Sequence, residues 1–401
     1  MLSSFLPYGR QSISEADIEA VVEVLRSDYL TTGPSVDRFE ADLAASVGAG
    51  DAVVVANGTA ALHIAALTQD LTANDVVIVP SITFTASANC IAFCGAQVVF
   101  ADVDPATGLM TDATFDEALD ALKTRHPANR FAGVIPVHYS GRPVALDHIS
   151  EVCVAHDAFL LEDACHAIGT DGPDGKTGAC AKSDMAVFSF HPVKTLTTGE
   201  GGAVTTNDPG LARRLRALRS HGIERDPLRF AGLGFGGDND AGSWIYEMHG
   251  LGYNYRLPDL NCALGIAQLK RLPHFLARRD ALVAGYQAAL EKRNLPVAWT
   301  APEADTRPAF HLFAVTIDFE ALGISRSTVM AGLKARGVGT QVHYIPVHRQ
   351  PWWRERALAG RDLPGADQYY RTTLSLPLYA DMQDGDPERV ITALEEVLDG
   401  L

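Results

Sequence analysis

Short, continuous apolar runs alternate with segments of helical periodicity over the first two hundred residues, and this alternation limits the possible folds most strongly. The runs predicted to be strands are 52–56, 76–80, 97–103, 133–138, 158–164, 185–190 and 201–206. Their apolar residues are consecutive and do not alternate with polar ones, which is typical of strands covered on both faces. The sequence therefore predicts an α/β fold with a mostly parallel sheet between helices.

Helices are expected between the strands at 59–67, 85–94 and about 113–124 and 146–156, and another follows the last strand at 208–220. Two more helices precede the sheet, capped by Ser14 and Ser35. A long helical segment follows Pro258, with a break expected near Pro273. The pattern then changes to strands at 311–319, 340–347 and 372–379 between helices at about 326–336 and 388–399. We therefore predict a large domain at 1–260 and a smaller C-terminal α+β domain at 261–401.

Composition excludes several classes of partner. The 401 residues include 33 basic and 49 acidic side chains, a formal net charge of −16, so we expect no nucleic acid partner. No apolar run is long enough to span a membrane. The N-terminus lacks a basic start and a sustained apolar stretch, so we expect a cytoplasmic protein without a signal peptide. The six cysteines are scattered, which favours reduced thiols and no metal site.

The segment "NGTAAL" follows the first predicted strand and opens a helix. Free N–H groups at such a turn bind phosphate, and the hydroxyl of Thr59 can add to Gly58 and its neighbours. In the alternative interpretation, Asn57 or Thr59 simply caps the helix. The motif alone does not decide between the two.

Two charged side chains stand at the carboxyl ends of predicted strands, where α/β sheets bind ligands. Asp163, in "LLEDACHA", ends a buried strand and needs a partner. That partner is either a structural cation or helix end, or the cationic ring nitrogen of a ligand. Lys194, in "FSFHPVKTLTTGEGGAV", lies in a turn between two strands and is either a solvated cation or a reactive amine.

Together, a phosphate turn, a buried carboxylate and a loop lysine are what pyridoxal 5′-phosphate requires. The lysine forms a Schiff base with the aldehyde, and the aspartate keeps the ring nitrogen protonated. A second motif, "GLGFGG" at 232–237, matches a dinucleotide fingerprint by letter. It neither follows a clear strand nor opens a helix, which disfavours a nicotinamide dehydrogenase.

The ordered motifs "NGTAAL", "TFTASAN", "EDACHAIG", "FSFHPVKTLTTGEGGAV", "RSHG" and "GYNYRLPDLNCALGIAQL" cover most of the chain. With these motifs the sequence resembles the DegT/DnrJ/EryC1/StrS nucleotide-sugar aminotransferases. The resemblance implies a PLP-dependent transferase of fold type I, with a seven-stranded sheet in the large domain. Within the family, "SFHPVKTLTTGEGGAVTTND", "RSHGI" and "TQVHYIPVH" are most similar to transaminases of pseudaminic acid synthesis.

The resemblance also implies roles at the cofactor. Lys194 would hold the cofactor and move the proton, Asp163 would hold the pyridinium nitrogen, and His166 would lie against the ring hydroxyl. Many relatives have Gln at the position of His166. The other implied contacts are Gly58, Thr59 and Ser189 with the phosphate, Phe84 with the ring face, and Asn254 with the phosphate of the other subunit's cofactor. The last contact implies a homodimer with shared active sites.

Candidate substrate contacts are less specific. For the sugar or diphosphate we select Tyr8, His343 and Tyr344. The planar guanidinium group of arginine matches the geometry of phosphate, so three arginines are candidates for the diphosphate: Arg225, Arg229 and Arg256. For each of them, the alternative is a surface ion pair. Two of the cofactor contacts also have structural alternatives. Phe84 is otherwise a plain core side chain, and His166 is otherwise a hydrogen-bonded polar residue without a catalytic role.

The resemblance implies transfer of the amino group of L-glutamate to C4 of a UDP-4-keto-6-deoxy amino sugar. Relatives with histidine in place of the lysine are dehydratases, so Lys194 favours transamination. Three alternatives remain open: a sister aminotransferase for another keto nucleotide sugar, a PLP-dependent lyase or dehydratase, and a PLP-binding sensor or regulator without turnover.

Overall fold

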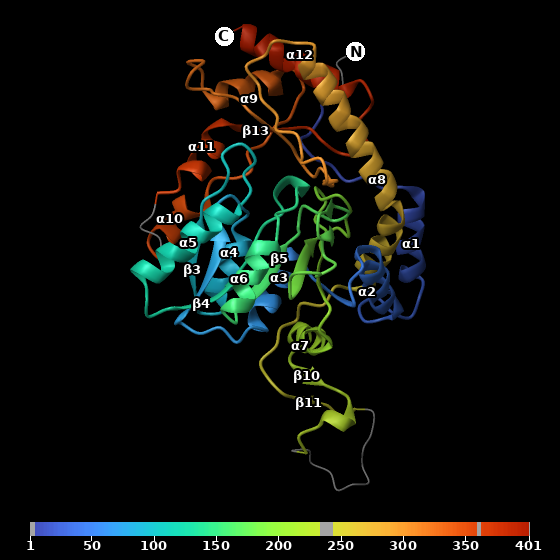
Figure 1. Cartoon of the computed structure of the whole chain (residues 1–401). Helices are drawn as coiled ribbons and strands as arrows, with labels where there is room; N and C mark the ends of the chain where they lie inside the picture. Colours follow the sequence, from blue (N-terminus) through green and yellow to red (C-terminus); the bar gives the residue numbers. More distant parts are fainter. Residues whose placement is uncertain (1–4, 233–243, 359–361, 401) are drawn as a thin grey trace.

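The computed structural model describes residues 5–232, 244–358 and 362–400. A large α/β body carries a smaller C-terminal part at one end, and both chain termini lie near that smaller part (Figure 1). The predicted fold class is confirmed, because the body is a mostly parallel sheet between helices. Among the described residues, no helix combines the length and the apolar character needed to cross a membrane.

The central sheet has seven strands in the order β1-β9-β8-β5-β4-β2-β3. Only β9 runs antiparallel to its neighbours β1 and β8. The strands are β1 (Asp51–Val55), β2 (Asp75–Pro80), β3 (Gln97–Ala101), β4 (Arg130–Val134), β5 (Phe159–Asp163), β8 (Met185–Ser189) and β9 (Gly202–Thr206). All seven predicted strands are present, although β4 lies earlier in the chain than predicted.

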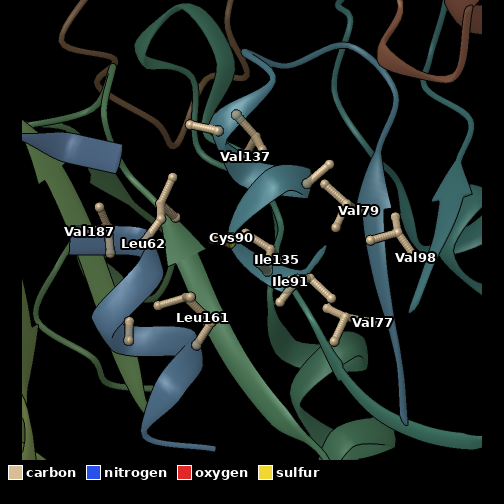
Figure 2. Close-up of a cluster of buried hydrophobic side chains, with 14 of the residues drawn as sticks. Leu62, Val77, Val79, Cys90, Ile91, Val98, Ile135, Val137, Leu161 and Val187 are labelled. Atoms are coloured by element: carbon tan, nitrogen blue, oxygen red, sulfur yellow. The ribbon is translucent and has the colours of Figure 1, made fainter. Parts of the chain in front are cut away.

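Helices cover both faces of this sheet. The helices of the body are α1 (Glu15–Leu25), α2 (Pro34–Val47), α3 (Gly58–Leu67), α4 (Ala86–Phe93), α5 (Asp112–Arg125), α6 (Asp147–Ala155) and α7 (Pro209–Arg219). Leu62 of α3 and Ile91 of α4 meet Val77, Leu161 and Val187 from the strands beneath them (Figure 2). On the opposite face, α5 and α6 cover one half of the sheet, and α2 covers the other.

Helix α8 (Asp259–Glu291) links the body to the C-terminal part. The predicted break near Pro273 is wrong, because the helix continues through this residue. A proline inside a helix costs about 3 kcal/mol. Burial of Leu269, Leu272 and Phe275 against the body offsets that cost.

The predicted capping of α2 by Ser35 is also wrong. Gly33 occupies the cap position and Pro34 the first helical turn. The carboxylate of Asp259 accepts the N–H groups of Gly33 at 2.9 Å and Val36 at 3.3 Å. A side chain from the start of α8 thus takes the place of a local cap. Ser14, in contrast, caps α1 as predicted.

The C-terminal part contains a two-stranded antiparallel ribbon and several helices. These are β12 (Phe313–Thr316), β13 (Thr373–Leu376), α9 (Arg326–Ala335), α10 (Pro351–Arg354), α11 (Pro364–Thr372) and α12 (Asp386–Asp399). The predicted strand at 340–347 is wrong: this segment forms a single bridge, between Gln341 and Ser375. Helix α8 packs on α1, α2 and α12, so it is shared by the two parts. The boundary at 260/261 stays a prediction.

Short elements complete the chain. They are η1 (Tyr139–Gly141), β6 (Asp171–Gly172), β7 (Gly175–Lys176), β10 (Ile223–Glu224), η2 (Pro227–Arg229), β11 (Glu247–Met248) and η3 (Val347–Arg349). The hairpin of β10 and β11 extends away from the body below α7 (Figure 1). The motif at 232–237 begins here, but 233–237 lie outside the described residues.

Candidate active site

A cavity of about 830 Å³ opens at the carboxyl ends of the parallel strands, next to the C-terminal part. Its volume lies within the range of about 300–1,000 Å³ that is typical of small-molecule sites. Ten of the predicted site residues line it: Tyr8, Gly58, Thr59, Phe84, Asp163, His166, Ser189, Lys194, His343 and Tyr344. The fold thus brings most of the predicted site residues to one place.

Asp163 ends β5 at the floor of the cavity and is buried. Its Oδ2 accepts the hydroxyl of Ser87 at 2.6 Å, and its Oδ1 accepts the N–H of Cys165 at 3.1 Å. Both of these partners are uncharged, and no Lys, Arg or His among the described residues forms an ion pair with the carboxylate. A buried carboxylate needs a cationic partner. The site therefore fits a ligand that brings a positive charge to Asp163.

Lys194 lies in the turn after β8, and its backbone N–H bonds to the carbonyl of His191 at 2.8 Å. Burial lowers the pKa of its amine below the usual value, while Cys165 and Asp163 act in the opposite direction. A lowered pKa increases the fraction of neutral amine, which is the form that attacks a carbonyl and accepts a proton. Lys194 is thus placed as a reactive amine.

The thiol of Cys165 lies beside these two groups. Burial and the charge of Asp163 raise the pKa of this thiol well above its usual value. The protonated thiol is a poor nucleophile, since the thiolate is the reactive form. Cys165 therefore packs beside the site as a reduced thiol.

The turn between β1 and α3 contains the motif "NGTAAL", for which the sequence left two interpretations open, a phosphate site and a helix cap. The side chain of Asn57 caps α3 by accepting the N–H of Ala60 at 2.9 Å. This cap does not use the N–H groups of Gly58 and Thr59, which remain directed out of the helix N-terminus. Both interpretations of the motif therefore hold together: Asn57 is the cap, and the turn retains donors for an anion.

Glycine is required where β9 passes behind this turn. A Cβ on Gly202 would lie 2.5 Å from the carbonyl carbon and oxygen of Asn57. A Cβ on Gly58 would lie 2.9 Å from the Cβ of Ser189. The absence of both side chains lets the turn and Ser189 approach each other, and Gly58 and Ser189 both line the cavity.

His166 is a neutral donor with a defined tautomer. Burial, followed by the charge of Lys194, lowers the pKa of the ring well below its usual value. Its Nδ1 accepts the N–H of Ser140 at 3.2 Å, and its Nε2 lies 3.1 Å from the hydroxyl of Tyr344. Because Nδ1 acts as an acceptor, the proton of the neutral ring is on Nε2. His166 therefore donates Nε2–H to the hydroxyl of Tyr344, and both residues line the cavity.

The C-terminal part supplies the facing wall. Nδ1 of His343 lies 2.8 Å from the hydroxyl of Ser375, and burial lowers the pKa of this histidine to about 3. Tyr139 donates to the carbonyl of His343 at 2.7 Å. The ring of Tyr8 lies 5.5 Å from that of His343. These contacts fix the wall through neutral groups.

Phe84 is 58% exposed at the cavity, so the alternative of a core phenylalanine is wrong. Its ring centroid lies 6.1 Å from that of Tyr344. A large apolar ring left open beside a cavity is a surface on which a flat ligand can pack.

Four predicted residues do not line the cavity: Arg225, Arg229, Arg256 and Asn254. Arg229 pairs with Glu224 and Asp226 on the hairpin, which matches the alternative of a surface ion pair. Arg225 lies over the ring of Tyr246 on the same hairpin. Asn254 bridges to Ser220 by its backbone. A single chain does not bring any of the four to the site.

Sequence reasoning missed several residues that the fold places here. Ser87 belongs to the motif "TFTASAN", but its hydrogen bond to Asp163 spans 76 residues of the chain. His63 and Tyr255 line the mouth of the cavity, with Nδ1 of His63 3.3 Å from the tyrosine hydroxyl. His311 also lines the cavity. Only contacts between distant segments identify these residues.

Comparison with known proteins gives the family. The model of the DegT/DnrJ/EryC1/StrS aminotransferase family matches residues 11–395. The chain belongs to this family. The resemblance found in the motifs is thereby confirmed.

Similar proteins cover the chain almost end to end. The spore coat polysaccharide biosynthesis protein SpsC of Bacillus subtilis is 38% identical over 399 residues, which are 99% of this chain and 98% of SpsC. PseC of Helicobacter pylori, an aminotransferase of pseudoaminic acid biosynthesis, has a TM-score of 0.87 at 24% identity, covering 99% and 100% of the two chains. Spr1654 of Streptococcus pneumoniae, in its PMP form, has a TM-score of 0.85 at 25% identity, covering 98% and 99%.

This member of the family is a PLP-dependent sugar aminotransferase, and its cofactor is pyridoxal 5′-phosphate. The residues of the cavity fit this cofactor. Asp163 offers a buried carboxylate to the ring nitrogen, Lys194 offers an amine to the aldehyde, and the turn before α3 offers N–H groups to the phosphate. The enzyme class and the cofactor that the sequence predicted are confirmed.

Proposed function

We propose that this enzyme transfers the amino group of L-glutamate to the C4 keto group of a UDP-4-keto-6-deoxy-N-acetylhexosamine. The reaction is that of a UDP-4-amino-4,6-dideoxy-N-acetyl-β-L-altrosamine transaminase of pseudaminic acid synthesis. The observation that carries the proposal is Lys194, a lysine and not a histidine, held with Asp163 in one cavity of a sugar aminotransferase. The motifs around Lys194, and the likeness to PseC in fold, support the pathway.

The residues of the chain divide the work of this reaction. When bound, pyridoxal phosphate supplies an aldehyde for the amino group and a ring that accepts electrons. Asp163, oriented by Ser87, would hold the ring nitrogen, and His166, paired with the hydroxyl of Tyr344, would lie against the ring hydroxyl. Gly58, Thr59 and Ser189 would bind the phosphate.

Lys194 would act as the proton carrier in both halves of the reaction. Burial lowers the pKa of its amine, so Nζ is able to accept the proton from Cα of glutamate. The same atom would deliver a proton to C4 of the sugar in the second half. Phe84, exposed at the cavity, would cover one face of the ring and exclude water. L-Glutamate and the keto sugar would bind in turn.

In the proposed homodimer, the second subunit would supply cationic and polar residues that the cavity of one chain lacks. The cavity wall of the described chain contains no arginine, although a UDP-sugar brings a diphosphate. The hairpin of β10 and β11 extends from the body (Figure 1). By their position in the chain, three of the predicted residues lie on or next to it: Arg225, Arg229 and Asn254. Leu228 on this hairpin is 94% exposed. We propose that the hairpin reaches the second subunit of a cytoplasmic homodimer and that Asn254 binds the partner's cofactor phosphate.

Complementation tests the shared site. Lys194→Ala and Asn254→Ala chains, each inactive alone, would be mixed, dissociated and reassociated. Hybrid dimers contain one site with both wild-type residues, so activity should recover. Mixtures that stay inactive while forming hybrids would contradict a shared site.

The substrate is tested directly. The purified holoenzyme would be incubated with L-glutamate and the UDP-4-keto-6-deoxy-N-acetylhexosamine, and the amino sugar and 2-oxoglutarate would be measured. Equimolar formation of both is expected. The 38% identity to SpsC favours one second candidate, a sister enzyme for another keto nucleotide sugar of a surface polysaccharide. Faster turnover of such a sugar would replace the proposed substrate with it.

A further inference from the structure

His311 lies in the cavity wall, and none of the roles described above uses it. Its side chain is 4% exposed and lines the cavity, while its Nδ1 is buried without a hydrogen-bond partner. Its ring centroid lies 4.4 Å from that of His166. Buried polar groups are normally hydrogen-bonded, and Nδ1 of His311 is an exception. The other ring nitrogen, Nε2, forms no hydrogen bond with the described chain either, so this edge of the ring is free to bond a ligand in the cavity.

The backbone of His311 is fixed on both sides, which leaves its ring as the group available to a ligand. Its N–H donates to the carbonyl of Ser140 at 3.0 Å, and its carbonyl accepts from the guanidinium of Arg279 at 3.2 Å. A Cβ on Gly141 would lie 3.1 Å from the nitrogen of His311, and the φ of +86° at this position favours glycine, so a larger residue would strain this close approach. The ring is thus held in place before any substrate arrives.

The electrostatic surroundings select the type of ligand. Burial lowers the pKa of His311 well below its usual value, and His166, Lys194, Arg279 and His343 add to the effect. The ring is therefore neutral, with one N–H to donate. Since Nδ1 has no acceptor to bond to, the proton is best placed on Nε2. The guanidinium of Arg279, which donates to the carbonyl of His311, adds a positive charge behind the ring and favours a negatively charged acceptor at Nε2–H.

The amino donor brings such an acceptor to this position. Its α-carboxylate is attached to the carbon that loses a proton to Lys194, and Lys194 is close enough to affect the pKa of both His311 and His343. The cavity wall of the described chain offers this carboxylate no arginine. We infer that Nε2–H of His311 binds the α-carboxylate of the amino donor, beside His343. The inference rests on the proposed function and assigns its donor subsite.

The test uses the holoenzyme and the two separate half-reactions. In a ping-pong reaction, kcat/KM for the amino donor reports only the first half, and kcat/KM for the keto sugar reports only the second. His311→Phe keeps an aromatic ring and removes the donor, so kcat/KM for L-glutamate should fall about 10- to 100-fold. The value for the keto sugar should stay within about threefold of the wild type.

Two variants control the result. His311→Gln places an amide donor near the position of Nε2 and should recover most of the loss. His274→Phe makes the same exchange at an exposed position on α8 and should behave as the wild type. The carboxylate assignment would be overturned if kcat/KM for L-glutamate were unchanged in His311→Phe. It would also be overturned if both His311 variants lost kcat/KM equally for L-glutamate and for the keto sugar. Wild-type enzyme that reacts with no α-amino acid would instead overturn the proposed function.

Discussion

The two walls of the cavity differ in how their polar groups are used. The wall at the strand ends carries Asp163, Lys194 and the N–H groups before α3, and these groups keep capacity for a ligand. The wall from the C-terminal part carries neutral rings that bond mostly to the protein: Tyr344 lies against His166, and His343 against Ser375. The first wall is built for chemistry, and the second is built to hold a shape.

This difference sets the order of expected effects. Removing a group from the strand-end wall takes away charge that the reaction needs, so activity should fall steeply. Removing a group from the C-terminal wall should mainly alter substrate binding or the stability of the fold. The predictions below test this contrast from the largest expected effect to the smallest.

Lys194→Ala should have the largest effect. Loss of the proton carrier should lower amino transfer by about 10³–10⁴-fold or more, measured as formation of 2-oxoglutarate. Lys182→Ala is a matched control, because Lys182 is an exposed partner of Asp147 away from the cavity. Residual turnover near the wild type in Lys194→Ala would remove the basis of the proposed mechanism.

Asp163→Asn should rank second. The variant keeps the size of the side chain and removes its charge, so kcat should fall about 10²–10³-fold, by the cost of breaking a buried charge pair. Ser87→Ala leaves the charge and removes one hydrogen bond to it, so the expected loss is about tenfold. Steady-state kinetics of both variants separate the two contributions. Equal losses would show that orientation, and not charge, dominates at this position.

Gly202→Ala tests the close approach behind the phosphate turn. The added Cβ would press on Asn57, which should lower the free energy of unfolding by about 1–3 kcal/mol and weaken binding of pyridoxal phosphate. Denaturant titration and cofactor titration measure the two effects. Gly250→Ala is the control, because a Cβ there meets no atom within 4 Å. If Gly202→Ala and Gly250→Ala had similar free energies of unfolding and similar affinities for the cofactor, the turn before α3 would tolerate displacement by the added Cβ.

The strand-end wall could be predicted because its causes are local. Asp163 and Lys194 each follow a recognisable buried strand, and the turn before α3 has its own motif. The C-terminal wall could be predicted only in part: His343 and Tyr344 are selected with the family resemblance, and both line the cavity. The strand expected at 340–347 is absent, and His311 was missed because its surroundings come from Ser140 and Arg279, which are distant in sequence. The same reason explains the wrong cap of α2, where Asp259 replaced Ser35.

The smallest expected effect concerns stability and pH in the C-terminal wall. Burial lowers the pKa of His343 to about 3, so below about pH 6.5 the unfolded chain takes up a proton at this residue that the folded chain does not. Stability should therefore fall as the pH is lowered from 6.5 toward 3, with a slope from this one group of at most about 1.4 kcal/mol per pH unit.

His343→Asn should flatten that slope, measured by denaturant titration at pH 7, 6 and 5. His148 provides a control of opposite sign, because its bond to Asp116 raises its pKa in the folded state. His148 therefore stabilises the folded state at low pH, and this stabilisation is lost as the pH rises through the raised pKa. His148→Asn should remove it, so the free energy of unfolding should fall slightly more steeply as the pH is lowered. If His343→Asn and the wild type lose stability in parallel, the histidine is protonated in the folded state, and the C-terminal wall carries charge like the wall that faces it.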